Sequence, residues 1–113
     1  MSKYMGIYMA PLSELEKMGS NSTPEEKKAG MNAWMQWMKD NEDSIEEEGA
    51  PLGKAKTVSL DGVKDTKNSI CGYTVVEAES HDAAAKLFEG HPHFGIPGGT
   101  IEVMECMEIP EME

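Results

Sequence analysis

Hydrophobic alternation is clearest at the start of the chain, in "KYMGIYMA" (residues 3–10). Tyr4 and Tyr8 share one face of this stretch, with small residues beside them. The opposite face consists of Met5, Ile7 and Met9. A period of two residues predicts a β-strand. Because both faces are apolar or aromatic, we expect neither face to be exposed to water.

A helical period follows between residues 24 and 38. Ser22 or Thr23 can cap this helix, and Pro24 suits its first turn. Residues at helical spacing form one stripe, which consists of Lys27, Met31, Trp34, Met35 and Met38. The stripe predicts that its methionines pack with Met5 and Met9 between helix and sheet, with Trp37 off the stripe.

The remaining pattern completes the set of elements. Residues 12–22 read as a loop with one helical turn at most, and residues 40–48 as a second, acidic helical stretch. Further strands are expected at 55–62, 71–80 and 100–109, with a helix at 81–90 and a loop at 91–99. We therefore predict a single α+β domain over residues 1–113. Its order β-α-β-β-α-β is ferredoxin-like, with two helices on one face of a four-stranded antiparallel sheet.

The other face of that sheet favours self-association. A large uncovered apolar face is unfavourable in water, and a second copy packed sheet to sheet would bury it by two-fold symmetry. The sequence therefore predicts a homodimer with a semi-enclosed cavity between the two sheets.

Charge and composition argue against several classes of binding partner. The chain of 113 residues has 21 acidic and 10 basic residues, a net charge of −11, and every basic residue is lysine. This balance argues against nucleic-acid binding, and the lack of arginine against phosphorylated ligands. No apolar run reaches the ~20 residues of a membrane span, and we expect no membrane partner. Cys71 and Cys106 form no CxxC motif, which favours a reducing, cytoplasmic location without a zinc site.

Several motifs together resemble the YCII-related family and its DGPF-type branch. They are "KYMGIYMAP", "TPEE", "VSLDGVKDTKNSICGY", "ESHDAA", and "HP" ahead of "IEV". The resemblance implies a ferredoxin-like protomer that pairs into a dimeric α+β barrel. It also implies a superfamily that includes isomerases and monooxygenases of small, often aromatic molecules. The chain departs from the family in three places: its first helix has no histidine, "DGPF" reads "DGVK", and Met104 replaces a usual arginine.

The histidines are the main candidates for chemistry. His91 and His93 flank Pro92, and an extended backbone would put both imidazoles on one side, as an acid/base pair or two metal ligands. The alternative is a rigid lead into the last strand, with imidazoles bonded to backbone carbonyls. We predict no metal site, since His81 is the only further histidine. His81 and Asp82 are adjacent on a helix and are better explained by helix capping than as a dyad.

Four other side chains are candidates for ligand contact. Tyr4 and Tyr8 could offer hydroxyl groups to a ligand if their face lines the dimer cavity. Asp61 and Asp65 could place a carboxylate at its mouth, although both also suit turns.

The favoured hypothesis is a protein that binds a small, apolar or aromatic ligand in the inter-sheet cavity. If it is catalytic, we expect cofactor-independent acid/base chemistry with His91 or His93 moving protons and Tyr8 orienting the substrate. No glycine-rich nucleotide motif is present, and no cofactor is expected. The alternative is a non-catalytic regulatory or interaction module whose acidic surface meets a basic partner.

Overall fold

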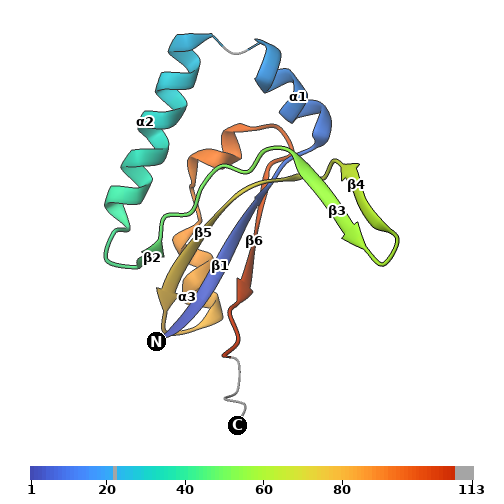
Figure 1. Cartoon of the computed structure of the whole chain (residues 1–113). Helices are drawn as coiled ribbons and strands as arrows, with labels where there is room; N and C mark the ends of the chain where they lie inside the picture. Colours follow the sequence, from blue (N-terminus) through green and yellow to red (C-terminus); the bar gives the residue numbers. More distant parts are fainter. Residues whose placement is uncertain (22, 109–113) are drawn as a thin grey trace.

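The computed structural model describes residues 1–21 and 23–108, and Figure 1 shows the arrangement of its elements. Ser22, a predicted alternative cap, and the acidic tail 110–113 lie outside the described residues. The elements in chain order are β1 (Ser2–Met9), α1 (Leu12–Asn21), α2 (Pro24–Asp40), β2 (Ile45–Glu47), β3 (Ala55–Ser59), β4 (Gly62–Thr66), β5 (Ile70–Ala78), α3 (His81–Leu87), the 3-10 helix η1 (Pro92–Gly95) and β6 (Thr100–Glu105).

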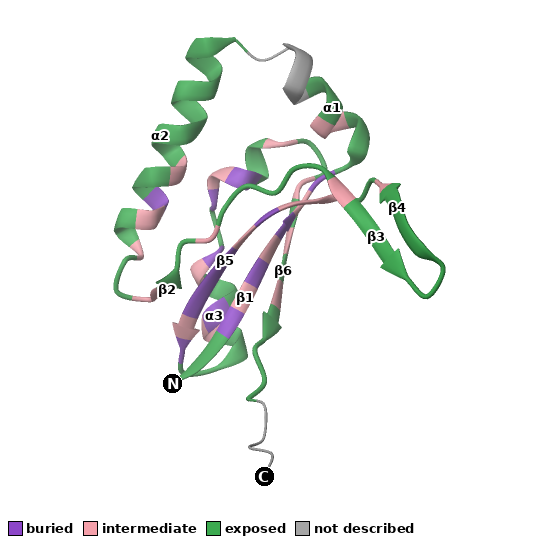
Figure 2. Ribbon diagram, in the orientation of Figure 1, coloured by how far each residue is buried: buried purple, intermediate pink, exposed green. Residues whose placement is uncertain are grey.

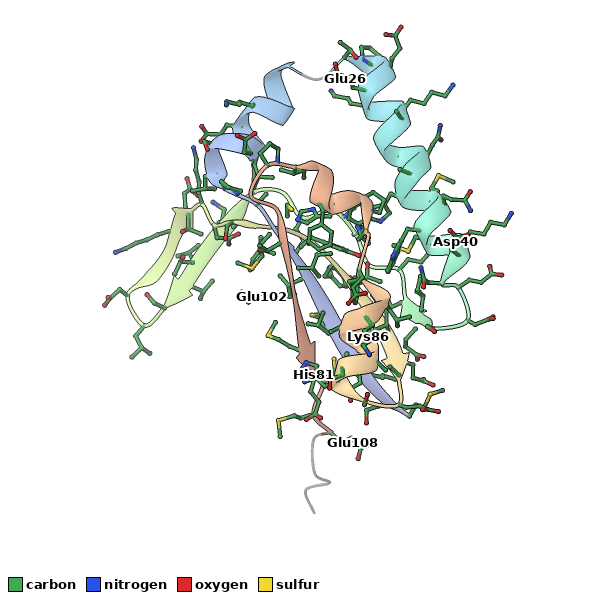
Figure 3. The ribbon with its side chains drawn as sticks, turned by 180° about the vertical axis from the view of Figure 1, so that it is seen from behind. Glu26, Asp40, His81, Lys86, Glu102 and Glu108 are labelled. Atoms are coloured by element: carbon green, nitrogen blue, oxygen red, sulfur yellow. The ribbon has the colours of Figure 1, made fainter. Side chains whose placement is uncertain are left out.

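The main sheet has four antiparallel strands in the order β2-β5-β1-β6. The central strand β1 pairs Gly6 with Thr74 of β5 on one side and with Val103 of β6 on the other. Helix α3 covers one face of the sheet, as Figures 1 and 3 show from opposite sides. This arrangement confirms the ferredoxin-like fold.

The core lies on the helix-covered face, where the buried positions of Figure 2 gather. Tyr4 and Tyr8 belong to this core, so their face of β1 is turned toward the helices and not toward an inter-sheet cavity. A Cβ atom at Gly6 would lie 2.5 Å from Cζ of Phe88, and only glycine permits this close approach. The open face of β1 carries the half-buried Met5, Ile7 and Met9.

The predicted methionine stripe of α2 is wrong at Met31 and Met35, which are 65% and 61% exposed. The first half of α2 extends beyond the sheet and has no core to cover (Figure 2). Met35 lies further along, between Trp34 and Trp37, on a side of the helix that does not face the core. The last turns do reach the core, through Trp34, Trp37 and Met38. Trp37, placed off the stripe by the sequence pattern, is the buried residue of this helix.

Two other predicted elements differ from the structure. Residues 12–21 form the helix α1 instead of a loop. The acidic stretch 40–48 is a turn followed by the edge strand β2, not a helix. Its carboxylates would repel one another at helical spacing, whereas the strand pairs Ile45 with Val76 and packs Ile45 on the core.

The strand predicted at 55–62 is not in the main sheet. It is the first strand of a separate two-stranded hairpin, β3–β4, and β2 takes the expected place at the edge of the sheet. Gly62 has φ 115°, a left-handed value that allows the tight turn between the strands. The hairpin projects from the side of the molecule that lies opposite α2 and β2 (Figure 1). Its exposed apolar side chains are Val58, Leu60 and Val63.

Candidate functional site

The segment after α3 is folded around its two histidines. His91 precedes η1 and is its N-cap, with its Nδ1 accepting a hydrogen bond of 2.9 Å from the backbone N–H of His93. Pro92 supplies the first position of the 3-10 helix, where its fixed φ is suited. The extended backbone expected for residues 91–93 is therefore replaced by a capped turn. His91 and His93 are both buried, with 2% and 3% of their surface exposed.

His93 attaches this turn to the sheet. Its Nε2 lies 2.7 Å from the backbone oxygen of Met9, so the imidazole donates to that carbonyl. This is the imidazole-to-carbonyl bond considered in the sequence analysis, and it fixes the position of η1 against the end of β1.

His91 lies inside a shell of aromatic rings. Its ring centroid is 4.4 Å from Trp37, 4.5 Å from Trp34, 4.9 Å from Tyr8 and 6.2 Å from Phe88. The tryptophans come from α2, the tyrosine from β1, and Phe88 from the end of α3. We call these four residues the aromatic shell. It brings together side chains that are up to 80 positions apart in the sequence.

The protonation of His91 follows from its contacts. Burial, with a smaller contribution from the nearby His93, lowers the pKa of His91 from 6.5 to about 4. The imidazole is therefore neutral at pH 7. Because its Nδ1 accepts a hydrogen bond, its single proton lies on Nε2. Within residues 1–21 and 23–108, this buried Nε2–H has no hydrogen-bond partner.

Tyr8 forms the start of a hydrogen-bond chain under the shell. Its hydroxyl lies 2.7 Å from Oγ1 of Thr74, which is 3.1 Å from the backbone oxygen of Glu48. The Thr74 hydroxyl donates to that carbonyl and so accepts from Tyr8. Burial raises the pKa of Tyr8 to about 12, an effect that the bond to Thr74 partly offsets. Tyr8 therefore keeps its proton and acts as a fixed donor.

The other predicted site residues lie elsewhere. Tyr4 is buried and stacks on His81 at 5.2 Å. Nε2 of His81 lies 2.7 Å from the oxygen of Val103, beside β6 in Figure 3. Asp61 and Asp65 are exposed on the β3–β4 hairpin and do not join the histidines in the protomer.

The sequence analysis missed the tryptophans and Thr74 as site residues. Trp34 and Trp37 are the only tryptophans of the chain and are three residues apart, which places them on neighbouring positions of one helix. That spacing could have indicated an aromatic site from the sequence alone. Thr74 carried no such signal, because only the strand pairing brings it to Tyr8.

Two hollows on the surface of the described residues are lined by no histidine. One, of about 270 Å³, is lined by Met35, Met38, Lys39, Glu42 and Glu48. The other, of about 240 Å³, is lined by Leu52, Gly53, Lys54, Ala55, Asn68 and Ile70.

The described residues offer neither a metal cluster nor a membrane-spanning helix. In the described part of the chain, no three His, Cys, Asp or Glu side chains are close enough together to hold a metal ion. Among its helices, none has the length and apolar character needed to cross a bilayer.

Comparison with known proteins identifies the fold. No family model matches the chain, and no curated protein matches it by sequence. Among solved structures, it is similar to the 5-chloro-2-hydroxyhydroquinone dehydrochlorinase TftG from Burkholderia phenoliruptrix AC1100, in complex with 2,5-dihydroxybenzoquinone. The TM-score is 0.55 at 18% identity, over 95% of this chain and 94% of that one. The chain therefore shares the α+β fold of that protein, whereas membership of the YCII-related family and of its DGPF-type branch remains a prediction.

Proposed function

We propose that this protein binds a small, flat aromatic molecule with an oxygen acceptor, and that His91 donates a hydrogen bond to that oxygen. The observation that carries this proposal is the unpartnered Nε2–H of His91, buried inside the aromatic shell. A buried donor without an acceptor is unfavourable by about 1–3 kcal/mol, and a ligand oxygen would remove that cost.

The shell suits the rest of such a ligand. Aromatic rings prefer stacked or edge-to-face contacts with other rings, and Trp34, Trp37, Tyr8 and Phe88 offer both. The ligand is expected to be uncharged or nearly so, because the chain has a net charge of −11 and the neutral His91 offers no positive charge to an anion.

Entry of a ligand requires a displacement of α2. The rings of the shell are packed together, and α2 supplies two of them, Trp34 and Trp37. Residues 24–33 of this helix are all exposed, so α2 is held to the body chiefly by its second half. A small outward movement of that half would open the space beside His91.

TftG supports the proposal at the level of fold and ligand type. Its structure was solved with 2,5-dihydroxybenzoquinone, a flat ring with oxygen acceptors. If the protein here is catalytic, the chemistry that its site contributes is polarisation of a ligand carbonyl by a neutral imidazole N–H, without a cofactor. This makes His91 a hydrogen-bond donor to the substrate, with His93 and Tyr8 fixing the geometry around it.

A matched pair of probes tests the binding. Acetophenone carries a carbonyl oxygen, whereas ethylbenzene has nearly the same shape without an acceptor. We expect acetophenone to bind at least about tenfold more tightly, measured by calorimetry and by tryptophan fluorescence, since both tryptophans contact His91.

Two variants control this experiment. His91→Phe keeps a ring but removes the donor, and should abolish the preference for acetophenone. His81→Phe changes a histidine outside the shell and should preserve it. Equal binding of both probes, or an unchanged preference in His91→Phe, would contradict the proposal. Turnover assays on the probe that binds best then decide between an enzyme and a binding protein.

A further inference from the structure

The space beside His91 is filled by side chains in this structure. His91 itself is 2% exposed. The two hollows on the surface of the described residues are lined neither by His91 nor by any ring of the aromatic shell. Small ligands are bound in pockets, so one side chain of the shell has to leave its position before a ligand can reach Nε2 of His91. The contacts of the four rings identify that side chain.

Three rings of the shell are fixed in place. Tyr8 is completely buried, and its hydroxyl is bonded to Thr74 at 2.7 Å. Nε1 of Trp37 donates a hydrogen bond of 3.2 Å to the backbone oxygen of Leu87, which attaches this ring to α3. Phe88 is 2% exposed and stacks on Trp37 at 5.3 Å. Movement of any of these rings would break a hydrogen bond or open the core, and both are unfavourable.

Trp34 differs from the other three rings. It is only partly buried and lies at the margin of the core. Its Nε1–H has no hydrogen-bond partner among residues 1–21 and 23–108. This nitrogen is not a buried unpartnered atom, as Nε2 of His91 is, so water can reach it. Rotation of the Trp34 side chain therefore breaks no hydrogen bond and exposes less additional apolar surface than movement of a buried ring.

The position of the Trp34 ring is also one that suits a ligand. The ring lies edge-on to His91 at 4.5 Å and to Tyr8 at 4.6 Å, with interplanar angles of 83° and 65°. Edge-to-face contact is an arrangement that aromatic pairs prefer, so a ligand ring in the same place would gain similar contacts. Such a ring would also lie against His91, whose Nε2–H is unpartnered.

We propose that Trp34 occupies the ligand position of this site and rotates out when a ligand binds. This inference rests on the proposed function and deepens it, because the volume that the indole vacates selects the ligand. The site accepts a flat molecule of one ring or of two fused rings, the size of an indole, and excludes larger fused systems. Trp34 thus determines specificity for ring size, and His91 determines specificity for the oxygen acceptor.

Trp34→Ala tests the proposal through the affinity of the two probes. If the indole competes for the ligand position, its removal should tighten the binding of both acetophenone and ethylbenzene at least about tenfold, because the cavity is then open before binding. Met35→Ala truncates the neighbouring, exposed side chain and should change either affinity by less than about twofold. Unchanged or weaker binding of both probes in Trp34→Ala would overturn the proposal and make Trp34 a wall of the site.

A fluorine label follows the Trp34 side chain without its removal. In protein that contains 5-fluorotryptophan, the two tryptophans give two ¹⁹F signals, and Trp34→Phe assigns them. Saturation with acetophenone should increase the difference in shift between H₂O and D₂O for Trp34 and leave that of Trp37 unchanged. A Trp34 signal that is no more exposed in the saturated protein would overturn the proposal. This measurement decides by itself if circular dichroism shows that Trp34→Ala is unfolded.

Ring size provides an independent test. 2-Acetonaphthalene carries the same ketone on two fused rings and should bind within about tenfold of acetophenone. 2-Acetylphenanthrene has three fused rings and should bind at least about 100-fold more weakly than the two-ring ketone, although it is more apolar. Equal or tighter binding of the three-ring ketone would contradict the size limit that Trp34 is proposed to set.

The outcomes separate this proposal from the proposed function. Tighter binding of both probes to Trp34→Ala, without a preference for acetophenone in either protein, would support the role of Trp34 and contradict that of His91. A preference for acetophenone with affinities that Trp34→Ala leaves unchanged would support His91 and contradict Trp34. Failure of both probes to bind either protein would contradict both.

Discussion

In the aromatic shell, side chains from three separate elements are buried against His91, whereas the β3–β4 hairpin exposes its largest apolar side chains. Both regions are built from apolar residues. The shell is completed by contacts within the chain, and the hairpin is not. The difference shows that the contacts which fold the body of this protomer do not extend to the apolar side chains of its hairpin.

Truncation of an apolar side chain should give the largest difference in the free energy of unfolding between the aromatic shell and the hairpin. Phe88, which is 2% exposed, packs on Tyr8 and Trp37, and Phe88→Ala should lower the free energy of unfolding by about 3–5 kcal/mol. Val63→Ala in the hairpin should change it by less than about 0.5 kcal/mol. Urea unfolding at a concentration where the chain is monomeric measures both. Similar losses would mean that the hairpin belongs to the same folding unit.

Acid should weaken the shell through His91. The pKa of His91 is lowered from 6.5 to about 4 on folding. As the pH falls below 6.5, the unfolded chain therefore binds a proton at this residue that the folded chain does not bind. Stability is full above pH 6.5 and is lost progressively down to pH 4. The loss from this residue should be about 2 kcal/mol between pH 7.5 and 5.

His91→Phe isolates this effect. Other groups also titrate, so the measured quantity is the difference in pH dependence between the unchanged protein and the variant, from urea unfolding at both pH values. An identical pH dependence in the two proteins would show that folding does not lower the pKa of His91.

Removal of a helix cap should have the smallest effect on the free energy of unfolding, and the effect should differ between α3 and α2. Ser80 caps α3 in the body, and Thr23 caps the projecting half of α2, each through a 3.1 Å bond from a backbone N–H. Ser80→Ala should lower the free energy of unfolding by about 1 kcal/mol. Thr23→Ala should lower it by less than half as much and instead increase hydrogen exchange at the start of α2, because that end can fray without global unfolding.

The sequence was sufficient for the fold because the central strands carry strong patterns. β1 and β5 alternate clearly, and Ser80 and Thr23 mark helix starts that the structure confirms. Short, polar segments were not predictable in this way. Residues 45–47 form the strand β2 because they pair with β5. Val58 lies in a hairpin because β3 pairs with the strand that directly follows it, β4, instead of with the main sheet.

The candidate site was predicted in part. Periodicity singled out Tyr8, and composition singled out His91 and His93, and the structure brings these three together. Their hydrogen bonds could not be predicted, since His91 accepts from a backbone N–H in a 3-10 turn that no local pattern indicated. The exposure of Met31 depends on how far α2 extends past the sheet, which is a property of the assembled fold.

The hydrogen-bond chain from Tyr8 through Thr74 to the backbone oxygen of Glu48 joins the aromatic shell to the hollow beside α2. One end is part of the aromatic shell, and the other end belongs to a residue that lines the hollow beside α2. If a molecule in the hollow changed the affinity of the shell for its ligand by some factor, thermodynamic reciprocity requires that the ligand change the affinity of the hollow by that same factor.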